Sequence, residues 1–93
     1  MAEFLVELYV SRADGAAVES SARSARLAAD ELTREGRPVE YLRSFFVPED
    51  ETCFLLYEAA TADDVEEAAR RASLPFACVA LALAGRERAE GHP

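Results

Sequence analysis

The sequence contains no lysine and no tryptophan, and its single histidine, His92, is the penultimate residue. With no histidine elsewhere, the chain cannot assemble the Ser-His or Cys-His pair that nucleophilic catalysis commonly uses. Its four glycines form no phosphate-binding loop or dinucleotide-binding motif, and its two cysteines form no CxxC motif. The usual sequence signatures of catalysis are therefore missing, and we expect a non-catalytic protein.

Basic residues are also scarce, because 10 arginines stand against 18 acidic residues and give a formal charge of −8. A protein that binds nucleic acid needs a basic face, so this balance argues against a nucleic-acid partner. The N-terminal apolar run is short, lacks a basic flank and is interrupted by Glu7, so we expect neither a signal peptide nor a membrane span. Two cysteines, Cys53 and Cys78, make no disulfide framework, which suits a reducing cytoplasm.

The strongest structural signal is the stretch of residues 41–59. Two runs rich in Tyr, Phe and other apolar residues flank Pro48-Glu49-Asp50-Glu51, a pattern that predicts a β-hairpin with an exposed turn. Alternating apolar residues predict a strand at 3–11, and helically spaced alanines predict a helix from about residue 15 to 35 that ends at Gly36. Thr61 caps a second predicted helix, and residues 76–83 read as a last strand.

The element order is therefore β-α-β-β-α-β, which indicates an α+β, ferredoxin-like fold. Two right-handed crossovers place both helices on one face of a four-stranded antiparallel sheet with strand order 4-1-3-2. We expect a single domain over residues 1–84, followed by a flexible charged tail over residues 85–93.

The other face of this sheet would be bare. A face so rich in apolar side chains would not remain in water on a soluble monomer, so we expect it to be covered by a second copy in a homodimer. The phase of the fourth strand stays open, because its residues are apolar on both sides. The residues expected on the bare face are Leu5, Glu7, Tyr9, Tyr41, Arg43, Phe45, Cys53, Leu55 and Tyr57.

Residues 2–83 also resemble a known family. The resemblance rests on VPEDETCF, with LRS before it and YEA after it, and on FLVELYVSR and AADELTREGRPV earlier in the chain. The family consists of small actinobacterial ferredoxin-like proteins of unknown function, one branch of which binds nickel. It implies a ferredoxin-like homodimer and a bound divalent metal, with nickel as the candidate. The chain departs from the family at two places. Some relatives carry a polar residue such as His or Tyr where this chain has Leu55, and relatives usually have charged residues in the last strand, which here reads FACVALALA. Both differences remove polar groups that could hold a metal.

If a metal is bound, Glu7 is the first candidate ligand because an acid in the middle of a sheet face needs a partner. Tyr9 and Tyr57 would lie beside it, and Cys53 would join if its thiol faced the same way. Carboxylate and phenolate oxygens would then dominate, so we expect weak binding that other divalent ions compete with. The alternative for Glu7 is a salt bridge to Arg43, and for the tyrosines it is simple packing.

Two other functions stay open. One is a small enzyme of the dimeric α+β-barrel type, an oxygenase or isomerase, with a pocket lined by Glu7, Tyr9, Arg43 and Tyr57. The other is a scaffold dimer without a small ligand. The turn acids lack the ligand spacing of a calcium loop, and two strand spacings would hold Cys53 and Cys78 roughly 10 Å apart, too far for a disulfide.

Overall fold

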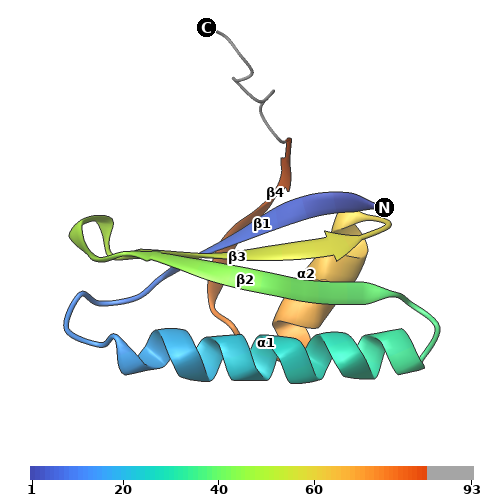
Figure 1. Cartoon of the computed structure of the whole chain (residues 1–93), viewed down its shortest axis with the longest axis horizontal. Coiled ribbons are helices and arrows are strands. Elements are labelled where there is room, and N and C mark those ends of the chain that lie inside the picture. Colours follow the sequence, from blue (N-terminus) through green and yellow to red (C-terminus); the bar gives the residue numbers. More distant parts are fainter. Residues whose placement is uncertain (84–93) are drawn as a thin grey trace, which may run out of the picture.

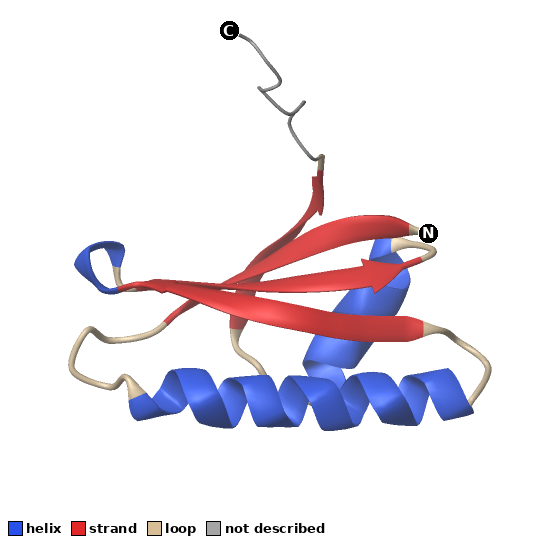
Figure 2. Ribbon diagram, viewed as in Figure 1, coloured by secondary structure: helices blue, strands red, loops and turns tan. Residues whose placement is uncertain are grey.

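The computed structural model describes residues 1–83, and the predicted tail and His92 lie outside this part of the chain. Its elements follow the predicted order, and the four antiparallel strands are arranged as β2-β3-β1-β4. Both helices lie on one side of the sheet (Figures 1 and 2), which confirms the ferredoxin-like fold. The bounds are β1 Ala2–Tyr9, α1 Ala16–Arg34, β2 Val39–Val47, a 3-10 turn at Pro48–Asp50, β3 Thr52–Ala59, α2 Ala62–Arg71 and β4 Phe76–Ala82.

The longer helix, α1, packs on the sheet through a stripe of small residues that includes Ala25, Ala28 and Ala29 and ends at Leu32. Alanines allow the helix backbone to come close to the sheet and leave room for large side chains that rise from the strands. Gly36 lies two residues beyond the end of the helix and has a φ of +97°. The amides of Gly36 and Arg37 donate to the carbonyls of Thr33 and Leu32, the Schellman pattern that glycine favours.

The shorter helix, α2, begins as the sequence predicts. The hydroxyl of Thr61 accepts a hydrogen bond from the amide of Asp64 at 3.2 Å, and acids occupy the first turn. Val65, Ala68 and Ala69 face the sheet. Neither α1 nor α2 is both long enough and apolar enough to cross a membrane.

The core lies between the helices and the covered face of the sheet. From β1 it receives Phe4, Val6 and Leu8, as the alternation of that strand predicts. In the antiparallel register these three residues lie opposite Tyr57, Leu55 and Cys53 of β3. All six side chains therefore point toward the helices, since directly paired residues share a face of the sheet.

Tyr57 is a large, fully buried side chain in this core. Its ring meets the ring of Tyr41 edge to face, with centroids 5.9 Å apart, and Arg26 of α1 lies over the Tyr41 ring at 5.6 Å. The Tyr41 hydroxyl is hydrogen-bonded to Ser44, whereas the Tyr57 hydroxyl has no partner among the described residues. Burial raises the pKa of Tyr57, so its phenol stays neutral.

This contrast predicts opposite effects for two equivalent substitutions. Tyr57→Phe removes a buried hydroxyl that has no partner, so it should leave the free energy of unfolding unchanged or raise it by about 1 kcal/mol. Tyr41→Phe removes a satisfied hydroxyl and should lower it by about 1 kcal/mol. Urea unfolding of both variants measures the difference. A clear loss of stability in Tyr57→Phe would mean that the Tyr57 hydroxyl is hydrogen-bonded to a buried water.

Candidate metal-binding face

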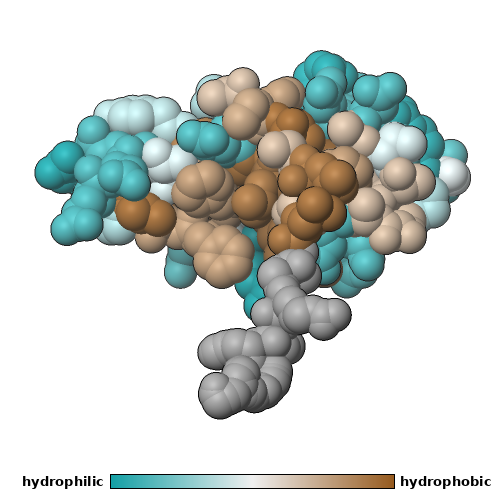
Figure 3. Space-filling model, turned by 90° about the horizontal axis from the view of Figure 1, so that it is seen from above, coloured by the Kyte–Doolittle hydropathy of each residue, from teal (hydrophilic) through white to brown (hydrophobic). Residues whose placement is uncertain are grey.

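The side of the sheet away from the helices, called the open face from here on, is apolar at its centre. Figure 3 looks onto this face and shows hydrophobic residues gathered in the middle, with hydrophilic residues toward both ends. The strand registers place the following residues on it: Glu3, Leu5, Glu7 and Tyr9 of β1, Glu40, Arg43, Phe45 and Val47 of β2, Thr52, Phe54, Leu56 and Glu58 of β3, and Cys78, Ala80 and Ala82 of β4.

Five of the nine residues expected on this face are there. Leu5 and Glu7 are half-buried among their neighbours, while Arg43, Phe45 and Tyr9 are exposed, Tyr9 to 66%. The predicted placement is confirmed for these residues because the alternation of β1, and of β2 from Arg43 onward, continues without a break.

For the other four the prediction is wrong. Cys53, Leu55 and Tyr57 are fully buried on the helix-covered face, because β3 pairs with β1 in the opposite phase to the one expected. Tyr41 also faces the helices, since the pairing of β2 with β3 shifts by one residue between Tyr41 and Arg43. Such a β-bulge turns side chains two positions apart to opposite faces. The expected grouping of Glu7 and Tyr9 with Tyr57 and Cys53 therefore does not form.

A different sulfur lies beside Glu7. Cys78 of β4 is paired directly with Glu7 of β1, and its thiol donates a hydrogen bond to Glu7 Oε1 at 3.5 Å. This hydrogen bond to the carboxylate, the desolvation of the thiol and the negative charge of Glu7 raise the pKa of Cys78. Both cysteines are free thiols, but only Cys78 is exposed. Burial raises the pKa of Cys53 and leaves it as a packing residue.

The salt bridge considered for Glu7 is not made within one chain. None of the six ion pairs among the described residues includes Glu7 or Arg43. The two residues lie on β1 and β2, which are separated by β3. Two strand spacings amount to about 10 Å. At that separation the Arg43 guanidinium and the Glu7 carboxylate do not reach ion-pair distance unless both side chains bend toward each other across β3. Among residues 1–83, Glu7 thus has a thiol beside it but no ion-pair partner.

The model of a family described as "Nickel responsive protein SCO4226-like" matches residues 4–81. The chain belongs to this family. A crystal structure of SCO4226 from Streptomyces coelicolor A3(2) is 18% identical in sequence to the chain, with a TM-score of 0.69, and the match covers 91% of this chain and 100% of that one. No curated protein matches the chain in sequence.

Membership of the SCO4226-like family directs attention to groups that can hold a divalent cation. Glu51, in the hairpin turn, is a poor candidate. The carboxylate of Glu51 accepts a hydrogen bond from the backbone amide of Arg12 at 3.0 Å and pairs with the Arg12 guanidinium at 3.6 Å. These contacts hold the pKa of Glu51 below its usual value and connect the turn to the end of β1. This acid therefore has a structural partner already.

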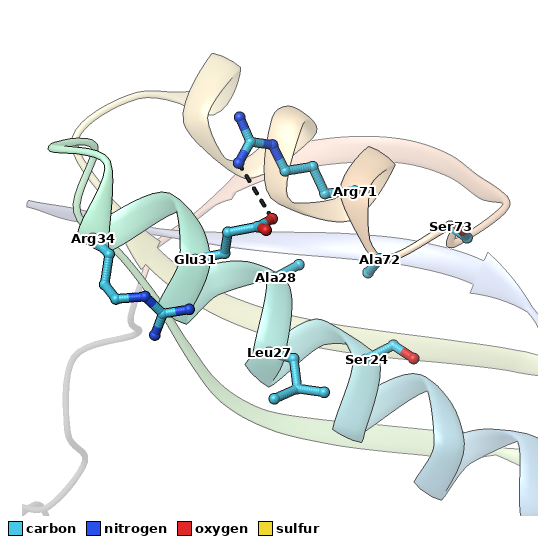
Figure 4. A pocket seen from close by; sticks show the side chains of 8 residues that line it. All are labelled: Ser24, Leu27, Ala28, Glu31, Arg34, Arg71, Ala72 and Ser73. Carbon is cyan, nitrogen blue, oxygen red and sulfur yellow. Dashed lines mark hydrogen bonds and ion pairs between the residues drawn. The ribbon is translucent and has the colours of Figure 1, made fainter.

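The groove between α1 and α2, a cavity of about 520 Å³, also contains acids with partners. Figure 4 shows Arg71 of α2 facing Glu31 of α1 across it. The Arg71 guanidinium lies 3.3 Å from Glu31, 2.7 Å from Glu35 and 2.9 Å from Glu67. It lowers the pKa of Glu35 and Glu67, as expected for carboxylates beside a fixed positive charge. This network connects the two helices, and each of its carboxylates already has an arginine partner.

The Glu7–Cys78 pair is therefore the feature that sequence reasoning missed. Its signal was weak because β4 is apolar on both sides and gives no phase of its own. The pair supplies one carboxylate and one thiol, and the described residues contain no group of three His, Cys, Asp or Glu side chains that could hold a metal. The described residues thus offer two ligands at this position, and Tyr9, two residues along β1 from Glu7, is the next polar side chain of that strand on the same face.

Proposed function

We propose that this protein is a non-catalytic homodimer that binds a divalent metal, with nickel as the favoured ion and Glu7 and Cys78 as its first ligands. The observation that carries the proposal is the direct contact between these two side chains on the open face, at 3.5 Å. Membership of a family described as nickel-responsive supports the choice of metal. We place the protein in the cytoplasm as part of the same proposal, because a metal-binding thiol must remain reduced.

The chemistry of the two groups suits a borderline transition metal. A thiolate favours such ions over Mg²⁺ and Ca²⁺, and a carboxylate adds the negative charge that a dication needs. On binding, the metal would replace the thiol proton of Cys78, which is now donated in the hydrogen bond to Glu7. The net charge of −8 adds a long-range attraction for cations. Ligands beyond these two would come from water or from the second copy.

The proposal of a homodimer rests on the size and chemistry of the open face. Phe45 is 47% exposed, and Leu5, Phe54 and Val47 are only partly covered by their neighbours. Four strands of about eight residues span roughly 20 by 25 Å, which is about 500 Å² if the sheet is treated as flat and the surface of the protruding side chains is left out. When the surface of the side chains is added, the area of the face approaches the roughly 800 Å² that each partner buries in a standard stable interface. A second copy offers the same apolar centre.

The first prediction of this proposal concerns the ligands. Glu7→Gln keeps the shape of the side chain but removes its charge, and it should weaken nickel binding by at least about tenfold. Cys78→Ser should do the same, because a hydroxyl does not ionise in the range where a thiol does. Isothermal titration calorimetry measures both affinities. Glu49→Gln, which removes one acid from the hairpin turn, is the matched control and should bind nickel as the native protein does.

The pH dependence follows from the raised pKa of Cys78. The free thiol is protonated at neutral pH, so metal binding must release its proton, and affinity should rise as pH increases toward the thiol pKa. Affinity should fall in acid, where carboxylates protonate as well. Calorimetry in two buffers of different ionisation enthalpy measures the released proton.

The ligand substitutions also have an outcome that contradicts the proposal. Unchanged affinity in Glu7→Gln, with lower affinity in Glu49→Gln, would place the metal at the turn instead.

The second prediction concerns the dimer. Phe45→Glu places a charge in the proposed interface and should weaken dimerisation by about 2 kcal/mol or more, roughly 30-fold in Kd. The monomer should stay folded, because Phe45 is exposed in the single chain. Sedimentation velocity over a range of concentrations measures the equilibrium. Leu27→Glu, at a position 64% exposed on α1, is the control and should leave it unchanged. A native protein that sediments as a monomer at micromolar concentration would refute the dimer.

A further inference from the structure

The outer strand β4 is weakly anchored in the sheet. It lies at an edge beside β1, and of its seven side chains three are half-buried and four are exposed. By contrast, β1 buries Phe4, Val6 and Leu8. Apolar residues fill both faces of β4, so turning the strand over would bury no charge. A register is strongly specified only where one face of a strand is buried, so the pairing of β4 with β1 is weakly specified.

The register of β4 contains an irregularity next to the proposed metal site. The pairing is regular up to Glu7 and Cys78. The next residue of β1 is then paired with Phe76, so Ala77 is the extra residue of a β-bulge. In an unbroken strand, Phe76 and Cys78 would lie on the same face, because they are two positions apart. The bulge instead lets Phe76 pack against the core while Cys78 lies on the open face.

The same residues allow a second, regular register. If the pairing of Phe76 is kept and the extra residue moves from Ala77 to the end of β4, every residue beyond the former bulge changes face. Cys78 then lies opposite Val6, beneath the helices, and Ala77 takes its place beside Glu7. The strand moves by one residue along the same neighbour, so its backbone groups remain paired.

The two registers differ little in what they bury. The observed register places Val79 and Leu81 on the helix side, but Val79 is only half-buried and Leu81 is 56% exposed. The regular register would place the smaller Cys78 and Ala80 there and would move the two larger side chains to the apolar open face. A free thiol packs as a small apolar group, so its burial has little cost. Burial therefore favours neither register strongly.

We propose that β4 exchanges between these two registers and that only the bulged register forms the Glu7–Cys78 pair. This inference rests on the proposed function, because it describes how the same site is assembled and disassembled. In the regular register the thiol lies beneath the helices, and an alanine stands beside the carboxylate. Since both side chains are needed to hold a metal, metal binding selects the bulged register and shifts the population toward it.

Two lysine substitutions test the proposal because they favour opposite registers. Val79→Lys places a charge beneath the helices in the bulged register but on the open face in the regular one. Ala80→Lys does the reverse, and in its favoured register each lysine occupies the same place on the open face. Cross-strand nuclear Overhauser effects between β1 and β4 identify the paired residues. We expect Cys78 to be paired with Val6 in Val79→Lys and with Glu7 in Ala80→Lys.

Nickel affinity gives a second readout. Because the two lysines reach the same place, their charge affects the metal equally, and only the register differs between the variants. Isothermal titration calorimetry should show that Val79→Lys binds nickel at least about tenfold more weakly than Ala80→Lys. The native protein without metal should show relaxation dispersion at the amides of β4 and of residues 6–8 of β1, and Zn²⁺, a diamagnetic probe, should suppress it.

The other results contradict specific parts of this account. A folded Val79→Lys variant in which Cys78 is still paired with Glu7 would overturn the register exchange and leave the metal site standing. Equal nickel affinities in two variants with different registers would show that the site does not depend on the register. If Val79→Lys does not fold, flat dispersion profiles along β4 of the native protein would overturn the proposal. A native protein that binds neither nickel nor zinc would refute the proposed function, while the pairing in the two variants would still decide the register exchange.

Discussion

The alternation of side chains along β1 is the constraint on which the rest of the molecule depends. This strand is paired on both sides, so its phase determines the phase of β3 and of β4. Phe4, Val6 and Leu8 pack under the two helices and form the centre of the core. Moving the register by one residue would expose all three and bury Glu7 beneath the helices, where its charge would have no partner. The same alternation therefore stabilises the fold and places Glu7 on the open face.

The architecture could be predicted from the sequence because each of its elements has a strong local signal. The apolar alternation of β1, the alanine stripe of α1 and the cap at Thr61 all agree with one topology. The phase of β3 could not be read from its centre, where five apolar residues follow one another from Cys53 to Tyr57. Its polar ends do carry the signal, since Thr52 and Glu58 share the open face with Phe54 and Leu56.

The error at Tyr41 has another cause. Glu40 and Arg43 both lie on the open face although three positions separate them, and only a bulge can reconcile that spacing with a strand. Strict alternation from Arg43 therefore assigned Tyr41 to the wrong side. The place of Cys78 beside Glu7 could not be predicted for a different reason. Its contact with Glu7 depends on the register between the first and last strands, which local patterns in an apolar strand do not determine.

The distribution of charge distinguishes Glu7 from other acids that the structure pairs. On the helix side and at the hairpin turn, arginines form ion pairs with Glu31, Glu35, Glu67, Asp64 and Glu51. Apart from the Arg71–Glu67 pair, which lies within α2, each of those contacts joins segments far apart in the sequence, and a cation there would compete with an arginine. Glu7 instead lies in apolar surroundings with a thiol as its neighbour, and it contributes to none of those connections. This carboxylate, which has no ion-pair partner among residues 1–83, is the reason that we propose the open face as the metal-binding face.

Paramagnetic broadening of backbone amide signals during a nickel titration tests this account most directly, because it locates the ion without any substitution. The account predicts that the first signals to broaden belong to residues around Glu7 of β1 and Cys78 of β4, while those of α1 and of the Pro48–Asp50 turn persist. Broadening that begins at the turn or in the groove between the helices, with β1 and β4 unaffected, would contradict it.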